Sequence, residues 1–163
     1  MTENIHLRAA IQDELMAING VIEAAVMNWH LPERIKRLAL PSYRYTNVDL
    51  EHLKVIVAER ADKDLVGVAA YEISATEIPG KQTVLLHGLY VRPEVQHQGI
   101  GSKLFSTVEA MVLKYGCDGL VVRAHVDAVG FFESHNMQRI ENPDLKSNYA
   151  HRLWKPVSMI QRT

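Results

Sequence analysis

The sequence lacks most of the features that set a chain apart from ordinary globular proteins. Its 163 residues include one cysteine, Cys117, which excludes an intramolecular disulfide framework. Its 18 basic residues nearly balance 19 acidic ones, for a formal net charge of -1, and no run of Lys or Arg breaks that balance. Proteins that bind nucleic acid by neutralising phosphates normally carry a basic stripe, so we expect no nucleic-acid partner.

Long apolar runs are also missing. Those present, such as Leu65 to Tyr71, are far shorter than the ~18 residues of a membrane span. The N-terminus shows no basic region followed by an apolar stretch, so we expect no signal peptide, no membrane association and a cytoplasmic protein. No linker-like stretch divides the chain, which predicts a single domain over residues 1–163. The histidines show no ligand spacing, so no metal site is expected.

Hydrophobic periodicity predicts alternating strands and helices. The expected strands are Ile5–Ala9, Lys54–Glu59, Leu65–Ser74, Thr83–Val91, Leu120–Val126 and Arg152–Val157. The expected helices are Asp13–Met27, Leu31 to about Leu40, Gly101–Tyr115 and Ala128–His135. Pro41–Asn47 is expected to be a loop, and Asn136 to take the left-handed conformation that closes a helix. This order predicts an α/β fold with helices on both faces of one mixed sheet.

The loop after the strand Thr83–Val91 carries the chemical information. It contains two glycines, Gly99 and Gly101, and leads directly into an amphipathic helix. The unpaired N–H groups and positive dipole end of a first helical turn bind phosphate, and glycines let the backbone approach a ligand closely. Ser102-Lys103 is the reverse of the Walker order, and Leu104 stands where a dinucleotide fingerprint has its third glycine. The pattern therefore indicates a pyrophosphate cradle, with a plain glycine turn that opens a helix as the alternative.

At these residues the chain resembles the GCN5-related N-acetyltransferase (GNAT) superfamily. The strand end Leu89-Tyr90-Val91-Arg92-Pro93 and the segment Gln96-His97-Gln98-Gly99-Ile100-Gly101 match its acetyl-CoA signature, and His125 to Met137 matches a second block more loosely. The resemblance implies the GNAT fold, with a single mixed, mostly antiparallel sheet. It also implies transfer of an acetyl group from acetyl-CoA to a primary amine by direct attack. A CoA-binding sensor without catalysis is the alternative.

The resemblance implies roles for particular residues. Backbone groups of Leu89, Tyr90 and Val91 would bind the pantetheine arm, and the N–H near Leu89 would polarise the thioester carbonyl. The pyrophosphate would lie on the residues Gln96, His97, Gln98, Gly99, Ile100, Gly101, Ser102 and Lys103. Phe131 and Phe132 would contact the cofactor. Phe132 replaces the tyrosine that often protonates the thiolate, and His125 replaces an asparagine, so His125 would donate a hydrogen bond or serve as the acid.

The acceptor side is less defined. His87 lies two residues before Leu89, where several relatives carry a glutamate, so it would be the general base or else a structural histidine. Trp29, Glu33 and Tyr71 are candidates for the acceptor wall, together with His87. The acceptor would be an amine-bearing small molecule, a protein N-terminus or a lysine. The resemblance also allows a homodimer that forms through the last strand.

Overall fold

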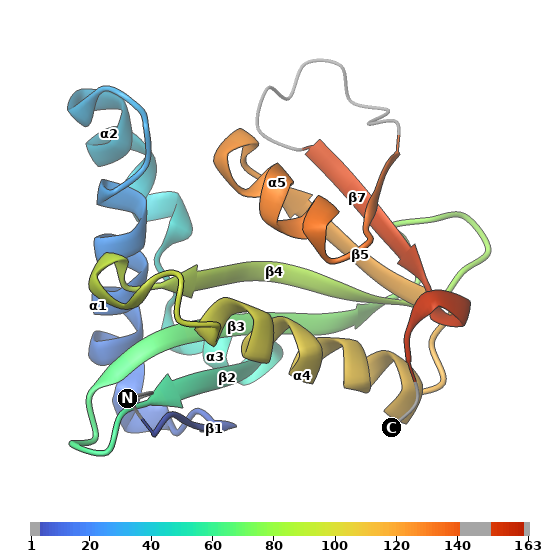
Figure 1. Ribbon diagram of the computed structural model, residues 1–163, viewed down its shortest axis with the longest axis horizontal. Coiled ribbons are helices and arrows are strands. Elements are labelled where there is room, and N and C mark those ends of the chain that lie inside the picture. Colours follow the sequence, from blue (N-terminus) through green and yellow to red (C-terminus); the bar gives the residue numbers. More distant parts are fainter. Residues whose placement is uncertain (1–3, 141–150, 162–163) are drawn as a thin grey trace. The chain divides into compact units, whose positions relative to one another are not determined.

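A computed structural model describes residues 4–140 and 151–161. Its seven strands form one mixed sheet in the order β1-β2-β3-β4-β5-β7-β6. They are β1 (His6–Ala9), β2 (Lys54–Glu59), β3 (Leu65–Ser74), β4 (Thr83–Val91), β5 (Gly119–Ala124), β6 (Gln138–Ile140) and β7 (His151–Pro156) (Figure 1). The pairs β1–β2, β5–β7 and β6–β7 are antiparallel and β4–β5 is parallel. The predicted mixed sheet is confirmed.

The helices also follow the predicted order, with one addition. They are α1 (Leu15–Met27), α2 (Glu33–Tyr43), α3 (Asn47–His52), α4 (Ile100–Lys114) and α5 (Val126–Ser134), with short 3-10 turns η1 (Gln12–Glu14), η2 (Pro93–Val95) and η3 (Val157–Met159). Asn136 has φ 67°, so the helix end expected there is confirmed, and Gly116 takes a similar left-handed φ of 65° after α4. None of the described helices is long and apolar enough to cross a membrane.

The expected loop at Pro41–Asn47 is wrong in part. Helix α2 continues through Pro41 to Tyr43, and α3 begins at Asn47. Helix α3 begins there because of a capping box: the Asp49 N–H donates to the Thr46 hydroxyl, and the Thr46 N–H donates to the Asp49 carboxylate. The strand expected at Leu120–Val126 ends at Ala124, because His125 is the N-cap of α5. Strand β6 was not expected at all.

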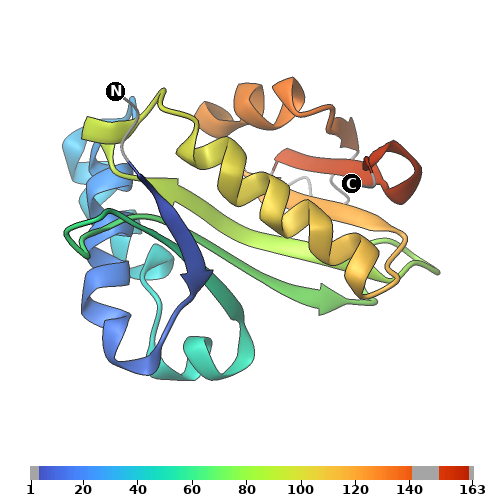
Figure 2. The same cartoon turned by 60° about the horizontal axis from the view of Figure 1, so that its bottom comes forward.

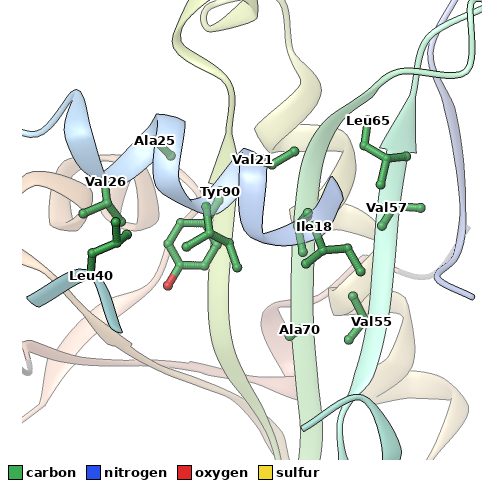
Figure 3. Packing of buried hydrophobic residues seen from close by; sticks show 12 residues of the cluster. Ile18, Val21, Ala25, Val26, Leu40, Val55, Val57, Leu65, Ala70 and Tyr90 are labelled. Carbon is green, nitrogen blue, oxygen red and sulfur yellow. The ribbon is translucent and has the colours of Figure 1, made fainter. Parts of the chain in front are cut away.

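Two compact units make up the chain, and the first consists of Met1–Ala70 with Leu89–Ser106. Its core lies between α1 and the strands, where Ile18, Val21 and Val26 are fully buried with Val57 and Val68 (Figure 3). Full burial of such a side chain stabilises the fold by about 1.5–3 kcal/mol.

Helix α4 covers the other face of these strands. A Cβ built on Gly67 would lie 2.9 Å from Leu104 Cδ1, so α4 packs directly against the β3 backbone and leaves no room for a larger residue. Strand β1 pairs with β2 at the edge of the sheet (Figure 2).

The second unit consists of Tyr71–Gly88 with Thr107–Thr163. Helix α5 packs on β5 and β7 (Figure 1). Lys155 on β7 is buried and donates to Glu109 Oε2 at 2.6 Å and to the His135 carbonyl at 2.9 Å, which ties β7 to α4 and to the end of α5. Arg123 donates two hydrogen bonds to Glu77, which fixes the β3–β4 connection on β5.

Candidate functional site

The loop between β4 and α4 is anchored at its start. The Arg92 N–H donates to the Val66 carbonyl and Arg92 Nε to the Leu65 carbonyl, each at 2.9 Å, so the exit of β4 is held on β3. Val95 is buried in η2, and Gln96 Nε2 donates to the Val91 carbonyl at 3.4 Å. The start of the loop is therefore held in place, and the residues after Gln96 extend from it within the first unit.

Two left-handed residues shape the tip of this loop. His97 has φ 66° and Gly99 φ 83°, and residues 97–99 are exposed. A Cβ on Gly99 would meet no atom within 4 Å, so glycine is favoured there by its backbone angle and not by crowding. The left-handed conformation is uncommon for a residue such as His97, which makes this a loop of unusual local shape.

Helix α4 begins directly after the left-handed pair. Ile100 is buried and fixes the helix start, and the Lys103 N–H makes the first helical hydrogen bond, to the Gly99 carbonyl at 3.0 Å. The backbone N–H groups that precede Lys103 in the first turn therefore have no acceptor within the helix, and they lie at the positive end of the helix dipole. This geometry suits an anion, and it includes the predicted residues Gln96 to Lys103.

The three predicted strand residues differ in what they can offer. Leu89 and Val91 are half-buried. Tyr90 is buried, and its side chain points into the core beside α1 (Figure 3). Burial raises the pKa of Tyr90 well above its usual value, with Tyr45 and Tyr43 adding to the effect. The side chain of Tyr90 is therefore part of the core, and its backbone is the part that a ligand could contact.

A polar cavity of about 390 Å³ also opens in the first unit. Three cations and three carboxylates line it, so it offers an anion no excess of positive charge. The lining residues are Glu14, Ala17, Arg60, Lys63, Asp64, Leu65, Arg92 and Glu94.

In the second unit, His87 on β4 lies against Glu72 on β3. His87 Nε2 is 3.2 Å from Glu72 Oε1, and the two side chains are 35% and 38% exposed. His87 is therefore accessible to a ligand, and not the buried structural histidine that was the alternative. The sequence singled out His87 but gave no sign of this pairing, which depends on how the two strands are aligned.

Tyr71 lies on the opposite side of β3 from Glu72. The two residues are adjacent on the strand, and successive side chains point to opposite faces. Tyr71 is 4% exposed, and its pKa is raised by burial and by Tyr115 at the end of α4. The structure therefore does not bring Tyr71 to the face where His87 meets Glu72.

Trp29 and Glu33 lie in the first unit, at the end of α1 and the start of α2. Trp29 is half-buried and meets Tyr43 edge to face, with ring centroids 5.1 Å apart. Glu33 Oε1 accepts from Arg37 Nη2 at 2.9 Å in an exposed ion pair one turn apart. A cationic ligand would have to compete with Arg37 for this carboxylate.

Tyr45, in the same unit, has a feature that the sequence does not reveal. Its hydroxyl is buried and has no hydrogen-bond partner in the described part of the chain. Its backbone is held by Asn19, whose side chain both donates to the Tyr45 carbonyl and accepts from the Tyr45 N–H. Burial raises the pKa of this phenol, so it stays protonated.

His125 has a fixed orientation as the N-cap of α5. The Asp127 N–H donates to His125 Nδ1 at 3.2 Å. Nδ1 carries no proton in this arrangement, so the neutral ring carries its proton on Nε2. Adding a proton to Nδ1 would break the cap and place a positive charge at a helix N-terminus, which the dipole disfavours. The geometry suits a hydrogen-bond donor better than an acid.

The aromatic pair that follows is asymmetric. Phe132 is 4% exposed, whereas Phe131 is half-buried. The two rings meet edge to face at 5.2 Å, and Phe131 also packs on the His135 ring at 4.5 Å. Phe131 is thus the one of the two with accessible surface, and Phe132 packs within the unit.

The comparisons with known proteins identify the family. The profile of the "Acetyltransferase (GNAT) family" matches residues 23–137, more than half of the chain, so this chain belongs to that family. A search of curated proteins finds no match.

Solved structures with the same fold cover nearly the whole chain. PaiA N-acetyltransferase from Thermoplasma acidophilum, in complex with coenzyme A, is 19% identical, with TM-score 0.75 over 94% of this chain and 99% of its own. A GCN5-related N-acetyltransferase from Rhodopseudomonas palustris is 16% identical, with TM-score 0.75 over 96% and 98%. AtaTR bound with acetyl-CoA is 18% identical, with TM-score 0.66 over 98% and 97%.

In residues 4–140 and 151–161, no group of three or more His, Cys, Asp and Glu side chains is placed to hold a metal ion.

Proposed function

We propose that this chain is an N-acetyltransferase that moves the acetyl group of acetyl-CoA to a primary amine. Membership of the GNAT family supports this proposal. The observation that carries it is the exposed left-handed pair His97 and Gly99, which leads into the N-terminus of α4 within the Gln-x-x-Gly-x-Gly segment.

In this proposal the loop binds the cofactor through its backbone. The amides from His97 to Ser102 bind the pyrophosphate, and the ammonium group of Lys103 adds positive charge nearby. The Gln96 N–H, which was expected to take part, already donates to the Pro93 carbonyl at 3.3 Å. Charge-assisted hydrogen bonds of this kind are about twice as strong as neutral ones. The backbone of Leu89, Tyr90 and Val91 receives the pantetheine arm in the manner of an added strand.

His87 prepares the amine. An alkyl ammonium cannot attack until it loses a proton, and imidazole has a reference pKa of about 6.5, close to neutral pH. His87 takes this proton, and the N–H bond's electron pair stays on nitrogen. The amine then attacks the thioester carbonyl, whose oxygen accepts from the Leu89 N–H. The C–S bond breaks, CoA leaves as thiolate, and the newly acylated nitrogen releases its remaining extra proton to solvent.

His125 and Phe131 complete the cofactor side. With Nδ1 occupied by the helix cap, His125 donates through Nε2 to an amide carbonyl of pantetheine. Phe131 offers the accessible ring of the aromatic pair. Phe132 has no proton to give, so the thiolate leaves without an acid from that position.

The acceptor side rests on fewer observations. Trp29 offers a half-buried aromatic surface and Glu33 a carboxylate, and both are proposed to contact the acceptor. A small-molecule amine, a protein N-terminus and a lysine fit this chemistry equally well. A second subunit that pairs through β7 would give a homodimer.

The position of Phe132 also favours a second candidate. A family member without the usual acid would serve as a CoA-binding sensor that performs no transfer. In that case acetyl-CoA binds and no amine releases CoA.

The test is the release of free CoA thiol from acetyl-CoA across a panel of small amines, amino acids and peptides. The proposal predicts amine-dependent release above the rate of hydrolysis for at least one acceptor class. Binding of acetyl-CoA without release on any acceptor would support the sensor, and absence of binding would overturn both.

A further inference from the structure

The charged partner of His87, Glu72, takes no part in the proposed reaction steps. Among the residues that the structure describes, Glu72 is the only carboxylate within ion-pair distance of His87, at 3.2 Å from Nε2. Both side chains are about one-third exposed, so solvent reaches the pair. The imidazole contacts the carboxylate through Nε2.

We infer that Glu72 is the positioning residue of His87: its carboxylate holds the imidazole proton on Nε2 and leaves Nδ1 as the atom that accepts the proton of the amine. This inference rests on the proposed function. It says which nitrogen of His87 accepts the proton, and it gives Glu72 the role of orienting the imidazole.

The argument begins from the lone pairs. An ionised carboxylate only accepts hydrogen bonds, and a neutral imidazole has one N–H and one bare nitrogen. If Nε2 were bare, two electron-rich atoms would face each other at 3.2 Å, which is repulsive. With the proton on Nε2, the same distance is attractive. The carboxylate thus selects the tautomer, as carboxylates that accept from a histidine N–H do in other functional sites.

The proton transfer then has a defined geometry. The amine's N–H bond breaks and a bond forms from Nδ1 to that proton, while the electron pair remains on the amine nitrogen. The ring becomes an imidazolium with both nitrogens protonated, and its Nε2–H still faces Glu72. The pair is then oppositely charged, so the contact persists through the step without rearrangement.

His125, in the same unit, takes the same tautomer but meets its protein partner through the other nitrogen. Its bare Nδ1 accepts from the Asp127 N–H, whereas the bare Nδ1 of His87 faces away from Glu72. His125 therefore presents a donor and His87 presents an acceptor. This difference assigns proton acceptance to His87 and not to His125.

The experiment compares Glu72→Ala, His87→Gln and the double variant. If Glu72 acts through His87, Glu72→Ala lowers kcat by part of the loss seen in His87→Gln, and the double variant is no slower than His87→Gln alone. The Kd for acetyl-CoA stays unchanged in all three. Glu23→Ala is the matched control, because it removes an exposed carboxylate from a surface ion pair with Arg44 at 3.3 Å. Losses in kcat that multiply in the double variant would overturn the inference.

A second measurement does not depend on turnover. Nitrogen NMR of the imidazole, taken well above its reference pKa, reports which nitrogen carries the proton. We expect His87 to be protonated on Nε2 in the wild type, and the Nε2–H fraction to fall in Glu72→Ala. An unchanged fraction would overturn the inference whatever the activity. If the fraction falls but no amine is acetylated, the proposed function is what fails, and the catalytic role of the pair with it.

Discussion

His87 is the side chain on which proton transfer depends in the proposed reaction. We expect His87→Gln to lower kcat by about 10²–10⁴-fold, the usual contribution of a positioned general base, because glutamine forms hydrogen bonds but takes no proton. The side chain is 35% exposed, so we expect the free energy of unfolding of the variant to lie within about 0.5 kcal/mol of the wild-type value. Steady-state kinetics at saturating acetyl-CoA, with a denaturant titration, measures both.

Near-wild-type kcat in His87→Gln would contradict this role. The base would then be water or a carboxylate such as Glu72, and His87 would have no part in the proton transfer.

Phe132 tests how the thiolate leaves. Phe132→Tyr places a hydroxyl where relatives often carry one, and we expect turnover to rise or stay unchanged. The residue is 4% exposed, so the new hydroxyl costs some stability if it finds no partner, by about 1–3 kcal/mol. Thiol release and thermal unfolding report the two effects. A collapse of turnover with normal acetyl-CoA affinity would show that the phenyl ring shapes the site.

The pairing of His87 with Glu72 shows what could not be predicted at this scale. Both residues lie in strands whose limits were predicted correctly, β3 and β4. Residues 75–82 connect these strands, and a connection of that length does not fix strand register as a two-residue turn does. Which side chains meet across the strands is decided by tertiary packing, and no local pattern records it.

At the scale of elements, the loop before α4 is the feature to test. Gly101→Asp puts a negative charge in the first turn of a helix proposed to hold pyrophosphate. The dipole tolerates that charge, so the fold is kept, but the ligand's own charge is repelled. We expect a large loss of acetyl-CoA affinity by calorimetry, and loss of the rise in melting temperature that a bound ligand gives.

Ser106→Asp is the matched control for this loop. It adds the same charge to an exposed position further along α4 and should leave acetyl-CoA affinity close to that of the wild type. If Gly101→Asp binds acetyl-CoA as the wild type does, the cradle lies elsewhere.

The edge strand β1 depends on a charge cluster that titrates. Arg8 Nη2 lies 2.6 Å from Glu14 Oε2 and 2.9 Å from Glu59 Oε2. The hydrogen bond from Arg8 is the largest cause that lowers the pKa of each carboxyl from 4.5. Because the unfolded chain binds these protons more readily, the stabilisation is complete above pH 4.5 and is lost as pH falls through the folded-state values.

Arg8→Met removes this effect. We expect its free energy of unfolding to be lower than that of the wild type near neutral pH, and to fall less steeply between about pH 5 and about pH 3. Urea titrations across that range measure the slope. Arg44→Met is the control, since its ion pair with Glu23 is exposed. An unchanged slope in Arg8→Met would mean that the cluster contributes nothing to acid stability.

The accuracy of element prediction also has a physical pattern. The strands Lys54–Glu59 and Thr83–Val91 were predicted to the residue, because β-branched runs end sharply at polar or proline residues. Helix α3 was missed although the capping box Thr46 and Asp49 was visible, because the aromatic and proline residues before it indicated a loop. Strand β6 is three residues long and depends on pairing with β7, so no local signal could reveal it.

At the scale of the whole molecule, the sequence predicts the family but not the acceptor substrate. The glycine segment and the element order were enough to predict the GNAT family, which the match over residues 23–137 confirms. The compared structures share the fold at 16–19% identity, and identity at that level leaves the acceptor open. Acceptor choice depends on side chains such as Trp29 and Glu33, which no shared pattern constrains.

The most direct test of the central claim follows the acetyl group itself. The protein is incubated with acetyl-CoA that carries a deuterated acetyl group and with the amine panel, and the masses of acceptor and intact protein are measured. We predict the label on an amine and none retained on the protein, because Cys117 is buried and burial raises the pKa of its thiol. Label retained on the protein would contradict direct attack, and unlabelled amines throughout the panel would contradict the transfer itself.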